Sequence, residues 1–369
     1  MARPDVIILG GGIIGCALAE ELARRGQRVV VIERGRIGQE ASSAAAGILS
    51  AQMDLPTPGP LFELCQAARR MYPRWVEHLE RRAGLSVGYH VDGILYLAMT
   101  GQEEHAMERQ LRWQTKRGLR ADRWSPKEVR RHEPAVDGKI RRGFRFPTEA
   151  QVDNVALMQA LAMACRASSV ELREDEVARR FLIKHQAVQG VETDHGVIEA
   201  AVVVNCLGSW AAMDGACPVE LPVEPARGQM LAFNAPRRLV RHAVMSDRAY
   251  LVQRRDGRLL VGSTIEHAGF EKALTLDGMH AILCGARHIS SALASCTFLD
   301  AWAGFRPYTK DRLPLLGKTH LEGLYVAAGH FRHGILLAPI TATVMAELIV
   351  RGHAQCDLSP FSPARFSRR

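Results

Sequence analysis

Three glycines near the beginning of the chain have a spacing that is typical of pyrophosphate binding. Gly10, Gly12 and Gly15 follow the apolar run of residues 6–9 and open a helical stretch. The first glycine permits a tight turn, the second lets the backbone approach the phosphates, and the third lets the helix pack against the strand. Free N–H groups at the start of the helix favour a negative charge. The spacing therefore predicts a dinucleotide site.

An acidic residue stands where a dinucleotide site needs one. Glu33 lies 18 residues after Gly15, at the end of the apolar run of residues 29–32. A carboxylate there can accept hydrogen bonds from both hydroxyls of an adenosine ribose, and it would repel the 2′-phosphate of NADP. Strand, glycines, helix and acid in this order predict a βαβ unit; the alternative is a glycine-rich loop without a ligand.

A second glycine-containing turn comes late in the chain. Residues 324–329 form an apolar run, followed by His330, Phe331, Arg332, His333 and Gly334 and then by an apolar helical stretch of residues 335–350. A helix N-terminus stabilises negative charge, which a reduced flavin carries at its N1–C2=O edge and a nicotinamide does not. The two histidines have no cysteine or carboxylate partner in the pattern, so no metal site is expected and His330 is expected to be structural.

The intervening chain alternates between helical and strand-like patterns. The ranges expected to be helical are 61–83, 102–133 and 153–167, and those expected to be strands are 93–97, 170–177 and the continuous apolar run 197–210. The pattern changes to alternation in three short stretches, 230–233, 249–252 and 258–262, and Asp256-Gly257 between the last two predicts a hairpin. An antiparallel sheet is therefore expected from about residue 223 to residue 304.

We therefore expect an α/β fold in which two domains are interleaved. A Rossmann-like FAD-binding domain would comprise residues 1–85, 150–222 and 305–365. A smaller antiparallel-sheet domain, which would bind the substrate, would comprise residues 86–149 and 223–304.

Composition limits the class of partner. The net charge is +9 over 369 residues, but the basic residues form no long run or amphipathic stripe, so neither nucleic acid nor a membrane is expected as a partner. No stretch approaches the roughly 18 apolar residues of a membrane helix. Because the first strand begins by Val6, no room is expected for a signal peptide, and eight cysteines without paired spacing favour reduced thiols in the cytoplasm.

Several motifs together carry a family resemblance over essentially the full length. They are the glycine loop, Glu33, the small-residue segment 41–49, the run Trp302–Asp311 and the run Ala328–Pro339. In this order they resemble the glycine oxidases of thiamine biosynthesis, within the D-amino-acid oxidase and sarcosine oxidase superfamily. The resemblance implies oxidation of glycine, sarcosine or small D-amino acids such as D-Ala to an imine, with oxygen reduced to hydrogen peroxide. It also implies a homotetramer or homodimer and a hand-off of the product to a thiazole synthase.

The resemblance implies FAD as the cofactor. The residues that it places at FAD, many through backbone atoms, are Ile13, Ile14, Glu33, Arg34, Ala41, Ser42, Ala46, Gly47, Ile48, Val177, His330, Phe331, Arg332, His333, Gly334, Ile335 and Leu336. Sarcosine-oxidase relatives tether the flavin through a cysteine where this chain has Arg306. The FAD is therefore expected to be non-covalent.

The resemblance also indicates the substrate residues. It places Arg306 at the substrate carboxylate, Arg332 as a second active-site arginine and Tyr250 with its hydroxyl at the carboxylate. A planar guanidinium offers two parallel donors for that task. No side chain is expected to act as acid or base, because the lone pair of a neutral amine can drive hydride transfer from Cα to the flavin.

Three positions and three other classes of enzyme stay open. Arg248, Ile265 and His333 depart from the pattern of the resemblance beside the expected pocket. A quinone-linked D-amino-acid dehydrogenase would use another electron acceptor, and the flavin subunit of a heteromeric glycine or sarcosine dehydrogenase would be inactive alone. A nicotinamide dehydrogenase is disfavoured by the late turn.

Overall fold

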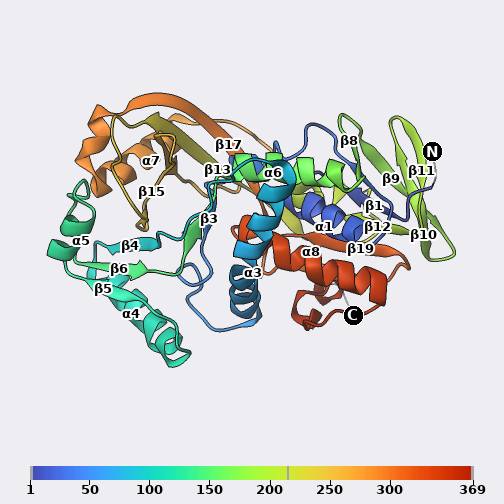
Figure 1. Ribbon diagram of the computed structural model, residues 1–369, viewed down its shortest axis with the longest axis horizontal. Coiled ribbons are helices and arrows are strands. Elements are labelled where there is room, and N and C mark those ends of the chain that lie inside the picture. Colours follow the sequence, from blue (N-terminus) through green and yellow to red (C-terminus); the bar gives the residue numbers. More distant parts are fainter. Residues whose placement is uncertain (1–2, 214–215, 367–369) are drawn as a thin grey trace.

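The computed structural model describes residues 3–213 and 216–366 and has two parts that lie side by side along its longest axis (Figure 1). Residues 1–2 and 214–215, which belong to the expected FAD-binding ranges, lie outside the described residues. One part contains α1 (Ile13–Arg24), α8 (Gly334–Arg351) and the strands around β1 (Val6–Leu9). The other contains α4 (Gly101–Lys116), α5 (Pro126–His132), α7 (Leu276–Ile289) and the strands around β4 (Ile94–Ala98). The long strands β13 and β17 reach from the second part to the first.

A six-stranded sheet forms the centre of the first part. Its order is β18 (Leu315–Lys318), β19 (Leu324–Ala328), β12 (Val202–Asn205), β1 (Val6–Leu9), β2 (Val29–Ile32) and β8 (Glu171–Arg173). All neighbours are parallel except β18, which runs antiparallel to β19. The strands read as continuous apolar runs because both faces of a parallel sheet are covered.

Helices cover one face of this sheet and a small sheet covers the other. The helices are α1 (Ile13–Arg24), α3 (Pro60–Ala83), α6 (Asn154–Ala167) and α8 (Gly334–Arg351). Val6, Ile8 and Val31 pack with these helices, whereas Ile7 and Val30 face the opposite way. The small sheet contains β9 (Ala178–Lys184), β10 (Ala187–Thr193) and β11 (Gly196–Glu199).

An eight-stranded sheet forms the second part. Its order is β17 (Thr297–Thr309), β13 (Val223–Asn234), β16 (Arg258–Gly262), β15 (Tyr250–Gln253), β14 (Ala243–Met245), β4 (Ile94–Ala98), β6 (Arg142–Phe146) and β5 (Asp122–Trp124). Asp256-Gly257 turns β15 into β16, so the predicted hairpin is confirmed. Only β14 and β4 are parallel neighbours in this sheet. Strand β17 crosses the boundary that was expected at residue 305.

Three expected elements were wrong in their extent. The strand expected over residues 170–177 is shorter, because β8 covers only Glu171–Arg173. The run 197–210 is not one strand: it divides into β11 and β12, which belong to different sheets, and a 3-10 turn at Gly208–Trp210. The Ala200 N–H bonds to the Gln189 carbonyl, which holds the chain at the break. The range 102–133 divides into α4 (Gly101–Lys116), β5 and α5 (Pro126–His132). Ser125 caps α5 together with Glu128, as a capping box.

One helix contradicts the expectation that no segment has the length and hydropathy of a membrane span. The 18 residues of α8 have a mean hydropathy of 1.6, enough to cross a membrane by length and composition alone. However, 67% of this helix is buried inside the protein, where it packs against α1 and α3. A core helix with protein on every side is apolar all round for the same reason as a membrane helix.

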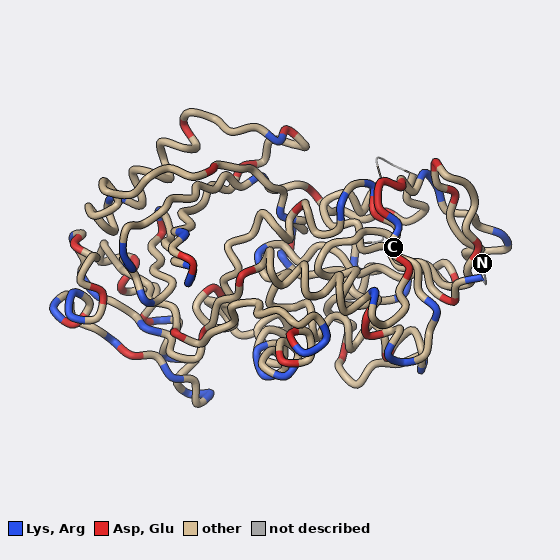
Figure 2. Tube along the Cα trace, turned by 45° about the horizontal axis from the view of Figure 1, so that its top comes forward, with Lys and Arg blue, Asp and Glu red and all other residues tan. Residues whose placement is uncertain are grey.

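Charge is spread over both parts of the molecule. In Figure 2 basic and acidic residues are interspersed along the chain, and no single region collects the basic ones. Many arginines are used in ion pairs with nearby carboxylates, such as Arg28 with Asp5 and Arg123 with Glu108.

Candidate active site

A cavity of about 540 Å³ lies between the two parts. It is lined by residues that follow the carboxyl ends of β1, β2, β12 and β19, and by residues of β13, β15, β16 and β17. The carboxyl edge of a parallel sheet is where doubly wound folds place their ligands. The cavity therefore joins the expected nucleotide site to the expected substrate sheet.

The glycine loop can be built only from glycines at two of its positions. Gly10 has a φ of +103°, and a Cβ there would lie 2.5 Å from the Cys206 carbonyl oxygen. A Cβ on Gly15 would lie 2.0 Å from the carbonyl oxygen of Gly10. Gly10 and Gly12 line the cavity, whereas Gly15 does not: it lets α1 pack against the loop.

The first turn of α1 faces the cavity without a side-chain cap. Ile13 and Ile14 line the cavity, and the Ile13 N–H donates to Ser42 Oγ at 2.9 Å. The hydroxyl of Ser42 keeps its own hydrogen to donate, so Ser42 can hold a phosphate oxygen next to the helix N-terminus.

The carboxylate of Glu33 is fixed at the cavity wall by two backbone groups. Its Oε2 accepts from the Gly11 N–H at 2.7 Å and its Oε1 accepts from the Gly35 N–H at 3.0 Å. Each oxygen has a further lone pair for a ribose hydroxyl. Next to it, Arg34 pairs with Glu40 and lies over the ring of Trp210, 3.7 Å from its centroid. All of these side chains line the cavity.

The small residues of segment 41–48 allow the chain to pack closely against its neighbours. The segment contains α2 (Ala41–Ala44) and the start of β3 (Ile48–Leu49), and its members Ala41, Ser42, Ala46, Gly47 and Ile48 line the cavity. Gly47 has a φ of +65°, and a Cβ there would lie 2.0 Å from the Val152 carbonyl oxygen. We call residues 41–48 the cradle segment.

The start of α8 forms another wall. His330, Phe331, Arg332, His333, Gly334, Ile335 and Leu336 all line the cavity, and no side chain caps the helix. His330 Nε2 contacts Thr341 Oγ1 at 3.1 Å, and burial lowers its pKa to about 3. Burial lowers the pKa of His333 to about 4, so both rings are neutral near pH 7. The buried Nε2 of His333 has no partner among the described residues.

These features fit FAD. The glycine loop and α1 suit a pyrophosphate, Glu33 suits a ribose, and the uncapped start of α8 suits the negative edge of a reduced flavin ring. The unpartnered Nε2 of His333 is a buried polar atom at the cavity that a ligand can satisfy. Of the residues expected at FAD, Val177 does not line the cavity; its N–H donates to Asp194 Oδ1 at 2.9 Å.

A half-buried guanidinium without an anionic partner among the described residues lies at the other end of the cavity. Arg306 Nη2 donates to Ser263 Oγ at 2.7 Å, and Nη1 donates to the Thr264 carbonyl oxygen at 3.0 Å. No described carboxylate lies within ion-pair distance of it. Burial lowers the pKa of Arg306, and the neighbouring Tyr250 raises it. A half-buried cation at a cavity wall that is bonded only to neutral oxygens is a site for an anion.

Two glycines that the sequence reasoning missed make room for this group. A Cβ on Gly228 would lie 2.2 Å from Arg306 Nη1, and a Cβ on Gly262 would lie 2.5 Å from the Tyr250 hydroxyl oxygen. The Tyr250 hydroxyl lies 2.9 Å from Met230 Sδ on β13. No local signal marks these glycines, because their neighbours belong to other strands.

Arg332 is more exposed than Arg306 and already has an acidic partner. Its Nη2 lies 3.2 Å from Asp54 Oδ1, a residue that the sequence reasoning also missed. The loop that carries Asp54 is held by α4: Gln110 Nε2 donates to the carbonyl oxygens of Gln52 and Met53. Arg332, Asp54 and Arg306 all line the cavity.

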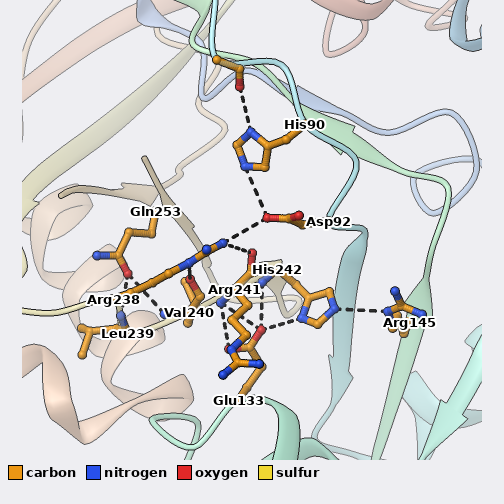
Figure 3. A network of polar contacts seen from close by, with 11 residues as sticks. His90, Asp92, Glu133, Arg145, Arg238, Leu239, Val240, Arg241, His242 and Gln253 are labelled. Atoms are coloured by element: carbon orange, nitrogen blue, oxygen red, sulfur yellow. Dashed lines mark hydrogen bonds and ion pairs between the residues drawn. The ribbon is translucent and has the colours of Figure 1, made fainter. Parts of the chain in front are cut away.

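A polar network outside the cavity holds the strand that leads to its wall (Figure 3). The buried carboxylate of Glu133 accepts from the backbone N–H groups of Arg241 and His242 and contacts His242 Nδ1. Arg145 Nε donates to His242 Nε2 at 3.1 Å. His242 directly precedes β14, after which the chain turns through the cavity wall to Tyr250. In that wall the Tyr96 hydroxyl donates to Asp247.

The three departures from the resemblance also line the cavity. Arg248 and Ile265 are exposed on its substrate side, whereas His333 is buried beside α8. Among residues 3–213 and 216–366, no group of three or more His, Cys, Asp and Glu side chains is arranged to hold a metal ion.

Known proteins match nearly the whole of this chain. A family model described as FAD dependent oxidoreductase matches residues 5–348. The glycine oxidase of Geobacillus kaustophilus is 35% identical over 369 residues, which cover 98% of this chain and 97% of that protein. The crystal structure of glycine oxidase from Geobacillus kaustophilus has a TM-score of 0.96 at 33% identity and covers 100% of both chains.

A longer relative matches over part of its length. The bifunctional protein ThiO/ThiG of Trichormus variabilis is 36% identical over 370 residues, which are 99% of this chain and 55% of that protein. The chain thus spans about half the length of this relative. The matches bear out the expected fold class and the resemblance that the motifs indicated, and FAD is the cofactor of the matched family. The chain belongs to the FAD dependent oxidoreductase family.

Proposed function

We propose that this chain is a glycine oxidase. Glycine, and other small substrates such as sarcosine and D-Ala, would lose two electrons and two protons to give the imine while oxygen becomes hydrogen peroxide. Water then converts the imine of glycine to glyoxylate and ammonia. The observation that carries the proposal is the half-buried Arg306, which has no anionic partner among the described residues and faces a cavity that fits FAD. Relatives named glycine oxidase over nearly the full length support it.

The residues of the substrate side can orient an amino acid. The guanidinium of Arg306 would bind the carboxylate through two donors, and the Tyr250 hydroxyl would give a further contact. FAD bound without a covalent link would supply the acceptor for a hydride from the substrate Cα. The uncapped start of α8 would stabilise the resulting negative charge, and the positioned substrate needs no side-chain base if its amine is neutral.

The proposal divides the work between the two expected domains. Residues 1–85, 150–222 and 305–365 would hold FAD and supply Arg306 and Arg332, and residues 86–149 and 223–304 would supply Tyr250 and the rest of the substrate wall. We place the protein in the cytoplasm as a homotetramer or homodimer that passes its product to thiazole synthesis. Support comes from its eight free thiols and from the relatives named ThiO/ThiG.

A substrate panel with peroxide detection tests the proposal. We expect hydrogen peroxide and glyoxylate from glycine, and higher kcat/KM for glycine and sarcosine than for D-Leu or D-Phe. L-Amino acids should be inert, because a bound carboxylate and amine turn their Cα–H away from the flavin. The measurement is steady-state kcat/KM for glycine, sarcosine, D-Ala, D-Leu, D-Phe and D-Asp, with oxygen and then a quinone as the acceptor.

The alternatives give different results in this panel. Turnover with a quinone but no peroxide would favour a quinone-linked dehydrogenase. A protein that is inactive alone would favour the flavin subunit of a heteromeric dehydrogenase. A preference for D-Asp would show that a cation such as the exposed Arg248 recruits a second carboxylate, and it would contradict the assignment to glycine.

A further inference from the structure

Arg254 is a buried arginine whose hydrogen bonds cross from the substrate sheet to the nucleotide part. It directly follows β15, and it is 6% exposed. Its Nη1 donates to the Val152 carbonyl oxygen at 2.6 Å, and its Nη2 donates to the Ala46 carbonyl oxygen and to Asn154 Oδ1, each at 2.9 Å. Arg254 does not line the cavity, so it acts on a ligand only through other residues.

Arg254 contacts the cradle segment near one end directly and near the other end through Asn154. Ala46 is itself a member of residues 41–48. Asn154, at the start of α6, donates from Nδ2 to the carbonyl oxygens of Ser42 at 2.8 Å and Ser43 at 2.9 Å. Arg254 and Asn154 thus fix three carbonyl groups of this segment, and with them the position of Ser42 Oγ beside the start of α1.

The same face of β15 reaches both sides of the cavity. Alternate residues of a strand share a face, so Tyr250, Val252 and Arg254 point one way. Tyr250 and Val252 pack in one apolar cluster with Ala46 and Ile48 of the cradle segment. Gln253 points the other way, where its Oε1 accepts from the Leu239 N–H (Figure 3).

Arg254 forms no ion pair with a carboxylate among the described residues. The carboxylate nearest in the chain to Asn154, that of Asp153, pairs instead with Arg258 Nη2 at 2.7 Å. Arg258 lies on the same hairpin and is more exposed than Arg254. Burial of an arginine whose acceptors are neutral is costly, and an apolar side chain would fill such a place at lower cost. A function in organising these carbonyl groups accounts for its presence.

We propose that Arg254 is a positioning residue that holds the cradle segment in its FAD-binding shape and fixes it relative to Tyr250. The inference rests on the proposed FAD site but not on the identity of the substrate. Arg254 would act on the flavin through Ala46 and Asn154, and the strand β15 would link flavin position to substrate position.

The test compares FAD binding by two variants of one hairpin. In Arg254→Met the dissociation constant of FAD from the apoprotein should rise at least about 10-fold, equivalent to about 1.4 kcal/mol. In the control Arg258→Met the dissociation constant of FAD should change less than about threefold. Arg258 also contacts the start of α6, but it does not contact the cradle segment. Arg254→Lys, which keeps the charge but not the forked donors, should fall between them. Fluorescence titration with FAD measures the dissociation constant for each variant. The temperature is one at which circular dichroism shows that each apoprotein is folded.

Bound FAD gives a second readout. At saturating FAD, the visible circular dichroism of the flavin should differ from wild type in Arg254→Met and not in Arg258→Met. If Arg254→Met does not fold, Arg254→Lys and Asn154→Ala test the inference in its place. Both variants should weaken FAD binding. The inference is overturned if these variants bind FAD within twofold of wild type, or if Arg258→Met weakens binding as much as Arg254→Met. A wild-type protein that oxidises no glycine would refute the proposed function and leave this comparison valid.

Discussion

Replacing Arg306 by alanine should lower kcat/KM for glycine at least about 100-fold, mainly by raising KM, while FAD stays bound. The lost contact is a charge-assisted, two-donor interaction with the substrate carboxylate, worth roughly 2–4 kcal/mol. The guanidinium is already fixed by Ser263 and Thr264, so little further ordering is needed when a substrate binds. Steady-state kinetics of the FAD-loaded variant measure the effect.

Two further variants make the Arg306 experiment specific. Arg306→Lys should recover only part of the activity, because an ammonium group lacks the planar pair of donors. Arg332→Ala should have a smaller effect, because Arg332 is exposed and already paired with Asp54. Near-wild-type kinetics in Arg306→Ala with flavin bound would refute the carboxylate assignment.

Replacing Gly228 by alanine should cause much of the same loss of kcat/KM although residue 306 remains an arginine. The new Cβ would lie 2.2 Å from Nη1 and 2.6 Å from Cζ of Arg306, too close for the guanidinium to remain in place. The arginine is the flexible partner of this contact, so it should move while the backbone of β13 stays. A displacement of about 1 Å at a substrate-binding group can cost about 100-fold in rate.

The Gly228→Ala experiment has a built-in control. At Gly101, the first residue of α4, the nearest atom to a new Cβ would be 3.9 Å away, so Gly101→Ala should leave kcat/KM unchanged. Both variants should melt within a few degrees of wild type and bind FAD. An unchanged kcat/KM in Gly228→Ala would mean that the position of Arg306 does not limit the reaction.

The elements that the sequence predicts well are those with local signals. The βαβ unit from Val6 to Glu33 was evident because glycine spacing, strand length and the acidic residue agree within one short segment. The hairpin at Asp256-Gly257 has an equally local turn signal. The late turn before α8 combines a buried strand, a glycine and an apolar helix.

The features that the sequence does not reveal depend on distant contacts. Residues 197–210 read as one apolar strand, and only the pairing with β10 and with β1 shows that they form two. Asp54 has no motif, because its loop is held by glutamines of α4 more than fifty residues later in the chain. Gly228 and Arg254 look ordinary until the strands opposite them are known. The helix α8 exceeded the expected hydropathy because the protein covers it on most of its surface.

Anaerobic mixing of the purified, FAD-loaded protein with glycine tests the central claim most directly. If glycine is the substrate, its addition should bleach the visible absorbance of the oxidised flavin, and oxygen should restore the absorbance with about one hydrogen peroxide per flavin. The same mixing with Arg306→Ala should bleach the flavin much more slowly at equal glycine concentration. A wild-type flavin that stays oxidised with glycine, sarcosine and D-Ala, yet is bleached by dithionite, would contradict the proposed function.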